Sequence, residues 1–396
     1  MSTSATASLV ERVQALDAAV LTPIVRRASG CAGTLTHWEV VALNILHGGL
    51  GASAIFRFSG AIQGTGAELA WSVILKVIAP GLPTKGPMLS SYLDCRREYE
   101  LYNSDLGRQF PAGFRAARAY DLSEQTNPEG EPEFWEWLED LGPFTRSPWR
   151  PEDHYQAAVG VGKFNGIYLA GQPLPEVPWL KQDLTRQYLQ LTAPSFERLA
   201  AQRDWPVVRR IYPPEEVDSL LQLWQEREQH LALLDRLPQT LCHGDAQYTN
   251  LFLVPTPAGE CETVAIDWGA IGPRNIGMDL SHMLGLAMTR ADPVSMPVIE
   301  AALFEGYLDG LRAAGWQGDA RLARLGLTAS MLKVRATFVL RPLSFFTDQG
   351  EPKEVFAGYL KQTGTSLDQW FEASAWMNPY VRRLFEESLE LRAQLL

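Results

Sequence analysis

The pattern of apolar and polar positions divides the chain into a strand-rich first part and a helix-rich remainder. Apolar, β-branched runs at residues 40–46, 54–58 and 71–78 are separated by glycine and polar residues, which is typical of antiparallel strands. An apolar stripe with helical spacing follows them and consists of Tyr92, Cys95, Tyr99 and Tyr102. We therefore expect a β-sheet with one accompanying helix near the N-terminus.

Farther along the chain, the apolar positions recur every three or four residues, which predicts amphipathic helices. The predicted helices cover residues 153–169, 215–237, 278–288, 298–314 and 322–341, and a last helix begins near Pro379. Residues 251–266 differ, because two apolar runs surround a Pro/Gly turn and predict a hairpin. No apolar run approaches the roughly 20 residues that a membrane-spanning helix needs, so we expect no membrane partner.

The segment that leads into this hairpin carries the strongest chemical signal. His243, Asp245 and Asn250 form an H-x-D-x-x-x-x-N array. Phosphoryl transfer from a nucleotide needs a carboxylate that orients the attacking hydroxyl, and an Asn and a second Asp that hold metal ions. Asp245 and Asn250 supply the first two of these groups.

Asp267 supplies the second acidic group, although 22 residues separate it from Asp245. The predicted hairpin folds Asp267 back towards Asp245 and Asn250. Carboxylate and amide oxygens suit Mg²⁺, a hard cation that keeps water and phosphate among its ligands. Taken singly, His243 is equally explained as a structural histidine and Asp267 as a turn residue.

These motifs resemble the aminoglycoside phosphotransferase/choline kinase family, the small-molecule kinases of the protein-kinase-like fold. The family carries an H-G-D-x-x-x-x-N loop, an I-D-W segment and a later Gly-x-Asp, matched here by residues 243–250, 266–268 and 277–279. The resemblance implies that Asp245 is the catalytic base and that Asn250 and Asp267 bind metal. It also implies that His243 and Asp279 support the catalytic loop, and we group His243 with the catalytic residues.

A kinase-like lobe also needs a glycine turn that covers the phosphates. Gly48, Gly49, Gly51 and Ser53 lie between two predicted strands and are our candidates for this turn. Small residues let backbone N–H groups approach phosphate. The segment departs from G-x-G-x-x-G because Ala54 takes the last glycine position, so an ordinary hairpin turn remains the alternative.

The strand that follows contains one cation, Lys76, within an apolar run that resembles the kinase V-A-I-K strand. We predict that Lys76 binds the nucleotide α- and β-phosphates. Its carboxylate partner should come from the next helix. Glu98 is the preferred partner, Glu100 is the second choice, and a solvated glutamate is the plainer alternative for both.

Residues 134–142 resemble the strand and hinge that join the two lobes in this family, where the hinge backbone meets the base. We therefore assign Glu139 and Leu141 to nucleotide binding. Backbone contacts leave no side-chain signature, so the sequence does not say which residue makes them.

The composition is that of a folded protein of 396 residues, with 46% hydrophobic and 20% charged residues. The net charge is −11, and no basic run indicates nucleic-acid binding. The four cysteines show no metal-binding spacing, and we interpret them as reduced packing residues of a cytoplasmic protein.

The expected fold is α+β and bilobal, with a small β-rich N-lobe and a large, mostly helical C-lobe. We place an N-terminal tail and helix at residues 1–29, the N-lobe at 30–142 and the C-lobe at 143–396. The C-lobe would contain the catalytic loop, the metal site and the acceptor-binding helices.

We expect an ATP- and Mg²⁺-dependent kinase that phosphorylates a hydroxyl of a small molecule, such as an aminoglycoside or another antibiotic. A choline- or homoserine-like metabolite is the alternative acceptor, and GTP is the alternative nucleotide. Two alternatives belong to other functional classes. One is a nucleotide-binding pseudokinase that acts through a partner, and the other is a metal-dependent hydrolase. The sequence does not reveal the oligomeric state.

Overall fold

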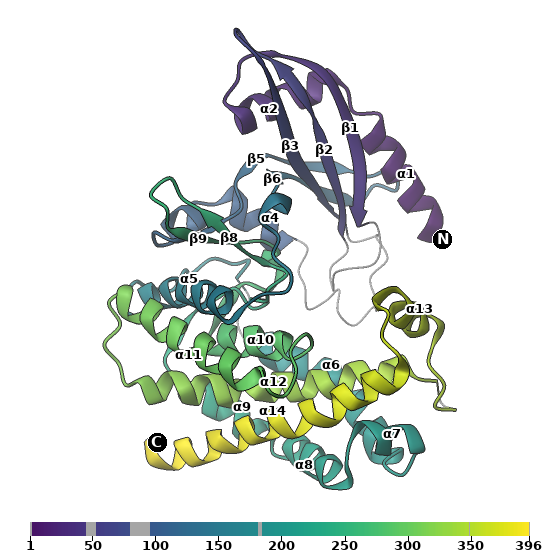
Figure 1. The fold of residues 1–396 in the computed structure, drawn as a ribbon, viewed down its shortest axis with the longest axis vertical. Helices are drawn as coiled ribbons and strands as arrows, with labels where there is room; N and C mark the ends of the chain where they lie inside the picture. The colour runs from purple at the N-terminus through teal and green to yellow at the C-terminus, as the bar shows by residue number, and fades with distance from the viewer. Residues whose placement is uncertain (1, 45–52, 80–95, 181–183, 348, 396) are drawn as a thin grey trace. The chain divides into compact units, whose positions relative to one another are not determined.

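A computed structural model shows a chain that folds into two compact units (Figure 1). Unit 1 consists of residues 1–110, 115–146 and 264–270, and unit 2 of residues 111–114, 147–263 and 271–396. The structure describes residues 2–44, 53–79, 96–180, 184–347 and 349–395. Within these ranges, no helix is long and apolar enough to cross a membrane.

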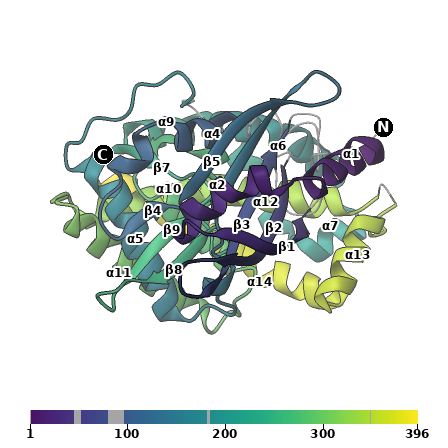
Figure 2. The same ribbon diagram turned by 90° about the horizontal axis from the view of Figure 1, so that it is seen from above.

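Unit 1 is built around a five-stranded antiparallel sheet with the strand order β1-β2-β3-β6-β5 (Figure 1). Its first three strands, β1, β2 and β3, lie side by side (Figure 2). Its strands are β1 (Thr34–Asn44), β2 (Ser53–Gln63), β3 (Glu68–Ile78), β5 (Ala119–Thr126) and β6 (Pro132–Glu139). Strands β5 and β6 form a hairpin whose turn consists of residues 127–131. Every side chain of β5 is partly or fully exposed, so its sequence does not need the alternation of polar and apolar residues by which a strand is recognised.

One face of this sheet is covered by two N-terminal helices, α1 (Ser2–Gln14) and α2 (Ala18–Ser29). Alternate residues of β3 and β6, such as Leu75 and Trp137, are buried in the same core as Leu21 of α2. Burial of apolar side chains of this size stabilises a fold by about 1.5–3 kcal/mol each. Helices α1 and α2 therefore contribute side chains to the core of unit 1.

The opposite face carries α4 (Arg96–Asn103), which follows β3 in the chain. The ring of Tyr99 packs on Phe134 of β6, with 5.0 Å between the ring centroids. The predicted helical stripe also included Tyr92 and Cys95, which lie outside the described residues. On this face, Glu98 of α4 reaches Lys76 of β3.

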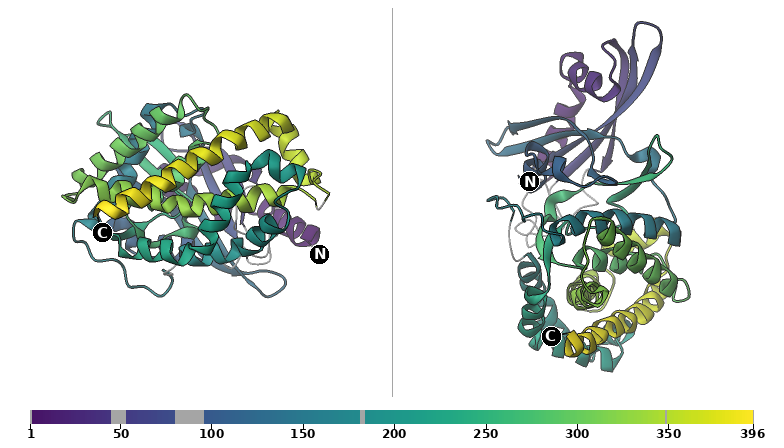
Figure 3. Two further views of the ribbon diagram at one scale, coloured as in Figure 1. Left: turned by 90° about the horizontal axis from the view of Figure 1, so that it is seen from below. Right: turned by 90° about the vertical axis from the view of Figure 1, so that its left-hand side faces the viewer.

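Unit 2 is mostly helical (Figure 3). Its helices are α5 (Pro151–Leu169), α6 (Leu184–Ala201), α7 (Pro206–Ile211), α8 (Pro214–Gln225), α9 (Arg227–Arg236), α10 (Met278–Ala287), α11 (Met296–Ala313), α12 (Ala320–Phe345), α13 (Glu354–Thr363) and α14 (Leu367–Leu395). Two strand pairs accompany them. Strand β7 (Gln239–Cys242) is antiparallel to β10 (Gly272–Asn275), and β8 (Leu251–Pro255) pairs with β9 (Cys261–Ala265), whose residues 264 and 265 belong to unit 1. Strand β4 (Phe114–Ala116) extends the second pair beside β9.

Two predicted helix boundaries are wrong. The helix expected over residues 215–237 is two helices, α8 and α9, which meet at Glu226. The last helix begins at Leu367, and Pro379 lies inside it. Pro379 does not mark the start of this helix, because a long helix can continue past a proline when surrounding packing compensates for the lost hydrogen bond.

Helices α5 and α11 pack closely against each other, and glycine residues lie at their contact. A Cβ atom on Gly310 of α11 would lie 2.2 Å from the carbonyl oxygen of Val159 and 2.8 Å from Cα of Gly162, both on α5. Backbone atoms cannot move aside as a flexible side chain can. This helix contact therefore requires glycine at residue 310.

We expect Gly310→Ala to lower the free energy of unfolding of unit 2 by about 1–3 kcal/mol, because the added methyl overpacks the α5–α11 contact. Urea titration followed by circular dichroism measures the change. Gly358→Ala in α13 is the matched control, since no atom lies within 4 Å of its added Cβ. The control should be neutral or stabilising by up to about 1 kcal/mol, and equal effects of both variants would contradict the packing argument.

Candidate active site

Unit 1 brings three of the predicted residues together around one ammonium group. Lys76 lies on β3, and its Nζ donates to Oε2 of Glu98 at 2.5 Å and to Oδ1 of Asp267 at 2.8 Å. Glu98 lies on α4, and Asp267 follows β9. The structure thus pairs Lys76 with Glu98, the glutamate that the sequence favoured over Glu100.

The carboxylates of Glu98 and Asp267 stabilise the positive charge of Lys76. Burial alone would lower the pKa of Lys76, but the carboxylates of Asp267 and Glu98 raise it above its ordinary value. Only 9% of the Lys76 side chain is exposed, against 45% for Asp267. Lys76 is therefore a fixed cation, while Asp267 is the partner that reaches solvent and can take another ligand.

The backbone at Asp267 is unusual. Its φ of 66° lies in the left-handed region. Among the described residues, Asp267 is the one non-glycine residue with a positive φ. The next residues are anchored, because the Trp268 side chain is fully buried and the Gly269 carbonyl accepts from Nη1 of Arg97 at 2.8 Å. Such local strain persists where surrounding structure imposes it, and it is common at functional sites.

Unit 2 contains the predicted catalytic loop, which begins where β7 ends at Cys242. The backbone N–H groups of His243 and Gly244 donate to the buried carboxylate of Asp279, at 2.9 and 2.8 Å. Gly244 has a φ of 83°, which glycine adopts without strain. The Gly-x-Asp segment expected to support the loop thus contributes Asp279 as its anchor.

The carboxylate of Asp245 is held by two side-chain amides. Asn250 Nδ2 donates to Oδ2 of Asp245 at 2.9 Å, and Gln247 Nε2 donates to the same oxygen at 3.0 Å. The N–H of Asp245 donates to Nδ1 of His243 at 3.2 Å, so this histidine shapes the loop. The structure therefore brings His243, Asp245 and Asn250 together in unit 2.

The donor set of these residues suits a hard divalent cation. Asn250 uses Nδ2 for Asp245, and its Oδ1 accepts one long hydrogen bond from the Thr249 hydroxyl at 3.4 Å, so Oδ1 is the atom with a lone pair that can bind a metal. Asp267 offers a carboxylate that is nearly half exposed. Oxygen ligands of this kind fit Mg²⁺.

The two hinge residues have different surroundings. The carboxylate of Glu139 binds Arg115 at 2.6 and 3.1 Å, and its N–H donates to the carbonyl of Arg118 at 2.9 Å. Any nucleotide contact of Glu139 would therefore have to use its backbone carbonyl. Leu141 is buried, and its carbonyl accepts from the N–H of Phe144 at 2.9 Å. Gly48, Gly49 and Gly51 lie outside the described residues, and Ser53 is described as the first residue of β2.

Some residues around these groups were missed by sequence reasoning. Asn165 of α5 donates to Asp279 at 3.1 Å and accepts from the hydroxyl of Tyr307 at 2.9 Å. Glu136 of β6 is fully buried opposite Lys76. The one available signal for Glu136 was an acidic residue inside the aromatic run of residues 134–137.

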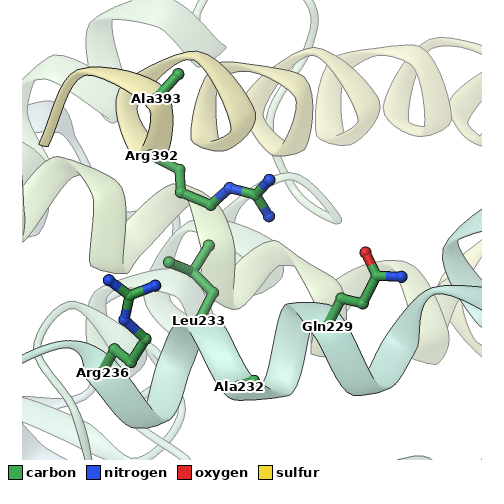
Figure 4. Close-up of a pocket in the computed structure, with 6 residues that line it drawn as sticks. All are labelled: Gln229, Ala232, Leu233, Arg236, Arg392 and Ala393. Carbon is green, nitrogen blue, oxygen red and sulfur yellow. The ribbon is translucent and has the colours of Figure 1, made fainter. Parts of the chain in front are cut away.

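A cavity of about 400 Å³ lies elsewhere in unit 2, where α9 faces the end of α14 (Figure 4). It is lined by Gln229, Ala232, Leu233, Arg236, Arg392 and Ala393. None of the predicted catalytic or nucleotide-binding residues belongs to this lining. The cavity is therefore not part of the candidate active site.

The comparison with protein families gives one match. The model described as "Phosphotransferase enzyme family" matches residues 125–322, which is half of the 396 residues. The matched range includes Asp245, Asn250, Asp267 and Asp279. No curated protein matches the chain in sequence.

Two solved structures show the fold. An amicoumacin kinase, solved with AMP-PNP, Ca²⁺ and its antibiotic, is 15% identical with a TM-score of 0.50, over 87% of this chain and 90% of that one. A microcompartment-associated aminopropanol kinase is 12% identical with a TM-score of 0.52, over 88% of this chain and 94% of that one. The expected α+β kinase-like fold, with a β-rich N-terminal part and a helical C-terminal part, is confirmed.

We expect Asp279→Ala to lower the free energy of unfolding by about 1–3 kcal/mol for each backbone N–H that loses its buried acceptor. Thermal unfolding of the purified variant measures this loss. Asp218→Ala is the control, because Asp218 forms an exposed ion pair with Arg203 and should change stability by less than about 1 kcal/mol. Similar melting temperatures for the two variants would show that Asp279 does not anchor the loop.

Proposed function

Since the chain belongs to the phosphotransferase enzyme family, we propose that it transfers the γ-phosphoryl group of ATP to a hydroxyl group of a small molecule. This membership confirms the family expected from the motifs at residues 243–250 and 266–268. The observation that carries the proposal is the Asp245 carboxylate, held by the amides of Asn250 and Gln247 within the catalytic loop. GTP is the alternative nucleotide.

Nucleotide binding is assigned to unit 1. Lys76 offers a fixed positive charge for the α- and β-phosphates, and Glu98 keeps that charge in place. Glu139 and Leu141 meet the base through their backbone. The glycine turn with Gly48, Gly49, Gly51 and Ser53 covers the phosphates.

Asn250 and Asp267 are assigned as ligands of Mg²⁺. When bound, the ion neutralises charge on the nucleotide phosphates. Lys76 already neutralises Asp267 in this structure through a 2.8 Å contact. Nucleotide binding should therefore exchange partners, with Lys76 moving its contact from Asp267 to phosphate oxygen.

Asp245 acts on the acceptor. Its Oδ2 is fixed by two N–H donors, so the carboxylate cannot rotate freely when a hydroxyl approaches. Asp245 orients this hydroxyl and takes its proton as the new O–P bond forms. Positioning of this kind, together with electrostatic stabilisation, supplies most of the rate enhancement in phosphoryl transfer.

The acceptor is proposed to be an aminoglycoside or another antibiotic, which would make the protein a resistance enzyme. A choline- or homoserine-like metabolite is the alternative. The two similar structures are kinases of an antibiotic and of an amino alcohol, and at 15% and 12% identity they do not favour either acceptor. We also propose a cytoplasmic location, and domain boundaries after residues 29 and 142.

A nucleotide-binding pseudokinase that acts through a partner is the alternative of another class. The presence of Lys76, Asp245, Asn250 and Asp267 in one chain favours the enzyme. A pseudokinase would bind ATP and phosphorylate no small molecule.

The function is tested by incubating the protein with ATP, Mg²⁺ and a mixed panel of hydroxyl acceptors. The panel contains aminoglycosides, macrolides, nucleoside antibiotics, amino alcohols, sugars and a metabolite extract, and mass spectrometry detects phosphorylated products. We expect one class of acceptor to gain a phosphoryl group. ATP binding without any product from the panel and the extract would favour the pseudokinase.

We expect Asp245→Ala to lower kcat by roughly 10²–10⁴-fold, the range typical for loss of a general base. Nucleotide affinity should stay near the wild-type value, because Asp245 orients the acceptor. Steady-state kinetics and calorimetric titration with an ATP analogue separate the two effects. Normal turnover in the purified variant would refute the assignment.

Asp267→Ala should instead weaken binding of the Mg²⁺–nucleotide complex, since the variant loses a proposed metal ligand. Calorimetric titration with and without Mg²⁺ measures the effect. Asp218→Ala serves as the control for a surface carboxylate of the same size. Unchanged Mg²⁺-dependent affinity in Asp267→Ala would exclude Asp267 as a ligand.

A further inference from the structure

Glu136 is a buried acid for which the proposed mechanism has no role. It lies on β6 directly opposite Lys76 of β3, and its residue exposure is 0%. Directly opposed residues in antiparallel strands point to the same face of a sheet. The carboxyl of Glu136 therefore lies on the face where Lys76 meets Glu98.

Helix α4 covers this part of β6. Tyr99 of α4 packs on Phe134, which points to the same face as Glu136 two residues along the strand. The neighbouring α4 residue, Glu98, reaches Lys76. Glu98 and Glu136 thus flank the same lysine from different elements.

Both glutamates have buried oxygens without a donor. No N–H or hydroxyl of the described residues donates to Oε1 of Glu98 or to either carboxyl oxygen of Glu136. Unsatisfied buried oxygens are rare in folded proteins, and each requires an explanation. Two adjacent carboxyl groups can satisfy each other when one of them carries a proton.

The charges in the cluster identify the group that carries the proton. Lys76 offers one positive charge, and Glu98 and Asp267 already bind it directly. A third carboxylate would be buried without compensation. Burial raises the pKa of both acids, and the direct contact with Lys76 partly offsets this for Glu98. The pKa of Glu136 lies well above its ordinary value because of burial and the nearby charge of Glu98.

We propose that Glu136 is a positioning residue of the nucleotide site: its protonated carboxyl donates to Oε1 of Glu98 and so fixes the carboxylate that holds Lys76. The inference rests on the proposed nucleotide site and adds to it the means by which Lys76 stays in place when Asp267 turns to the metal. It also links β6, which leads into the hinge at Glu139, to the lysine that binds phosphate.

Two substitutions separate this role from simple packing. Glu136→Gln keeps a hydrogen-bond donor of the same shape and carries no ionisable proton. Glu136→Leu fills the same space without a donor, and it should fold, because it removes a buried acid. Glu133→Gln is the matched control, since Glu133 is a buried acid of the same strand that binds Arg12 on the other face at 2.7 Å.

The first measurement is infrared difference spectroscopy of the wild type against Glu136→Gln at neutral pH, which needs no nucleotide. We expect the carbonyl band of a protonated carboxylic acid in the wild type and its absence in the variant. The control Glu133→Gln should retain the band. A spectrum in which Glu136→Gln removes no such band would overturn the proposal.

The second measurement is calorimetric titration of each folded variant with Mg²⁺ and a non-hydrolysable ATP analogue. Glu136→Leu should raise the nucleotide Kd by roughly tenfold or more, the scale of one lost positioning contact. Glu136→Gln and Glu133→Gln should stay within about threefold of the wild type, which is well below the effect of such a contact. Wild-type affinity in Glu136→Leu, or equal losses in the Leu and Gln variants, would overturn the role of Glu136. A wild type that binds no nucleotide would overturn the proposed function, and the infrared result would still report whether Glu136 is protonated.

Discussion

A lysine ammonium inside a β-sheet is the constraint on which unit 1 depends. An unpaired buried charge is too costly to maintain, so Lys76 requires carboxylates within hydrogen-bond distance. Glu98 comes from α4 and Asp267 from the segment after β9, so one side chain ties together three parts of the chain. The sheet supplies rigidity, because its other face is packed against α1 and α2. A cation fixed in this way is suited to phosphate, which must be bound without reorganisation of the site.

Unit 2 instead positions a carboxylate, that of Asp245. The loop after β7 is held through its backbone by Asp279, which is itself oriented by Asn165. Asp245 then has a fixed position, and two amides fix its rotation. These bonds satisfy buried polar groups and hold the Asp245 carboxylate in one geometry. Asp279 and Asn165 fix the loop backbone, whereas Gln247 and Asn250 fix the Asp245 side chain.

Sequence reasoning succeeded where chemistry demands particular residue types at fixed spacing. The H-x-D-x-x-x-x-N array is local, so its members meet through one short loop. Glu98 was chosen because it lies beside the apolar stripe of the helix that follows the Lys76 strand. The family and the fold could be predicted for the same reason. Glu136 and Asn165 could not be predicted, because strand register and helix packing bring them to the site. The start of α14 was misplaced because Pro379 resembles a helix beginning, and only tertiary packing shows that the helix continues through it.

The geometry of the proposed nucleotide site can be tested directly. A crystal structure with Mg²⁺ and a non-hydrolysable ATP analogue would show where the phosphates and the metal bind. We expect phosphate oxygens on Lys76, with Glu98 still paired to it, and one metal ion bound by Asn250 and Asp267. Phosphates that bind away from Lys76, or a metal held by neither Asn250 nor Asp267, would contradict the proposed site.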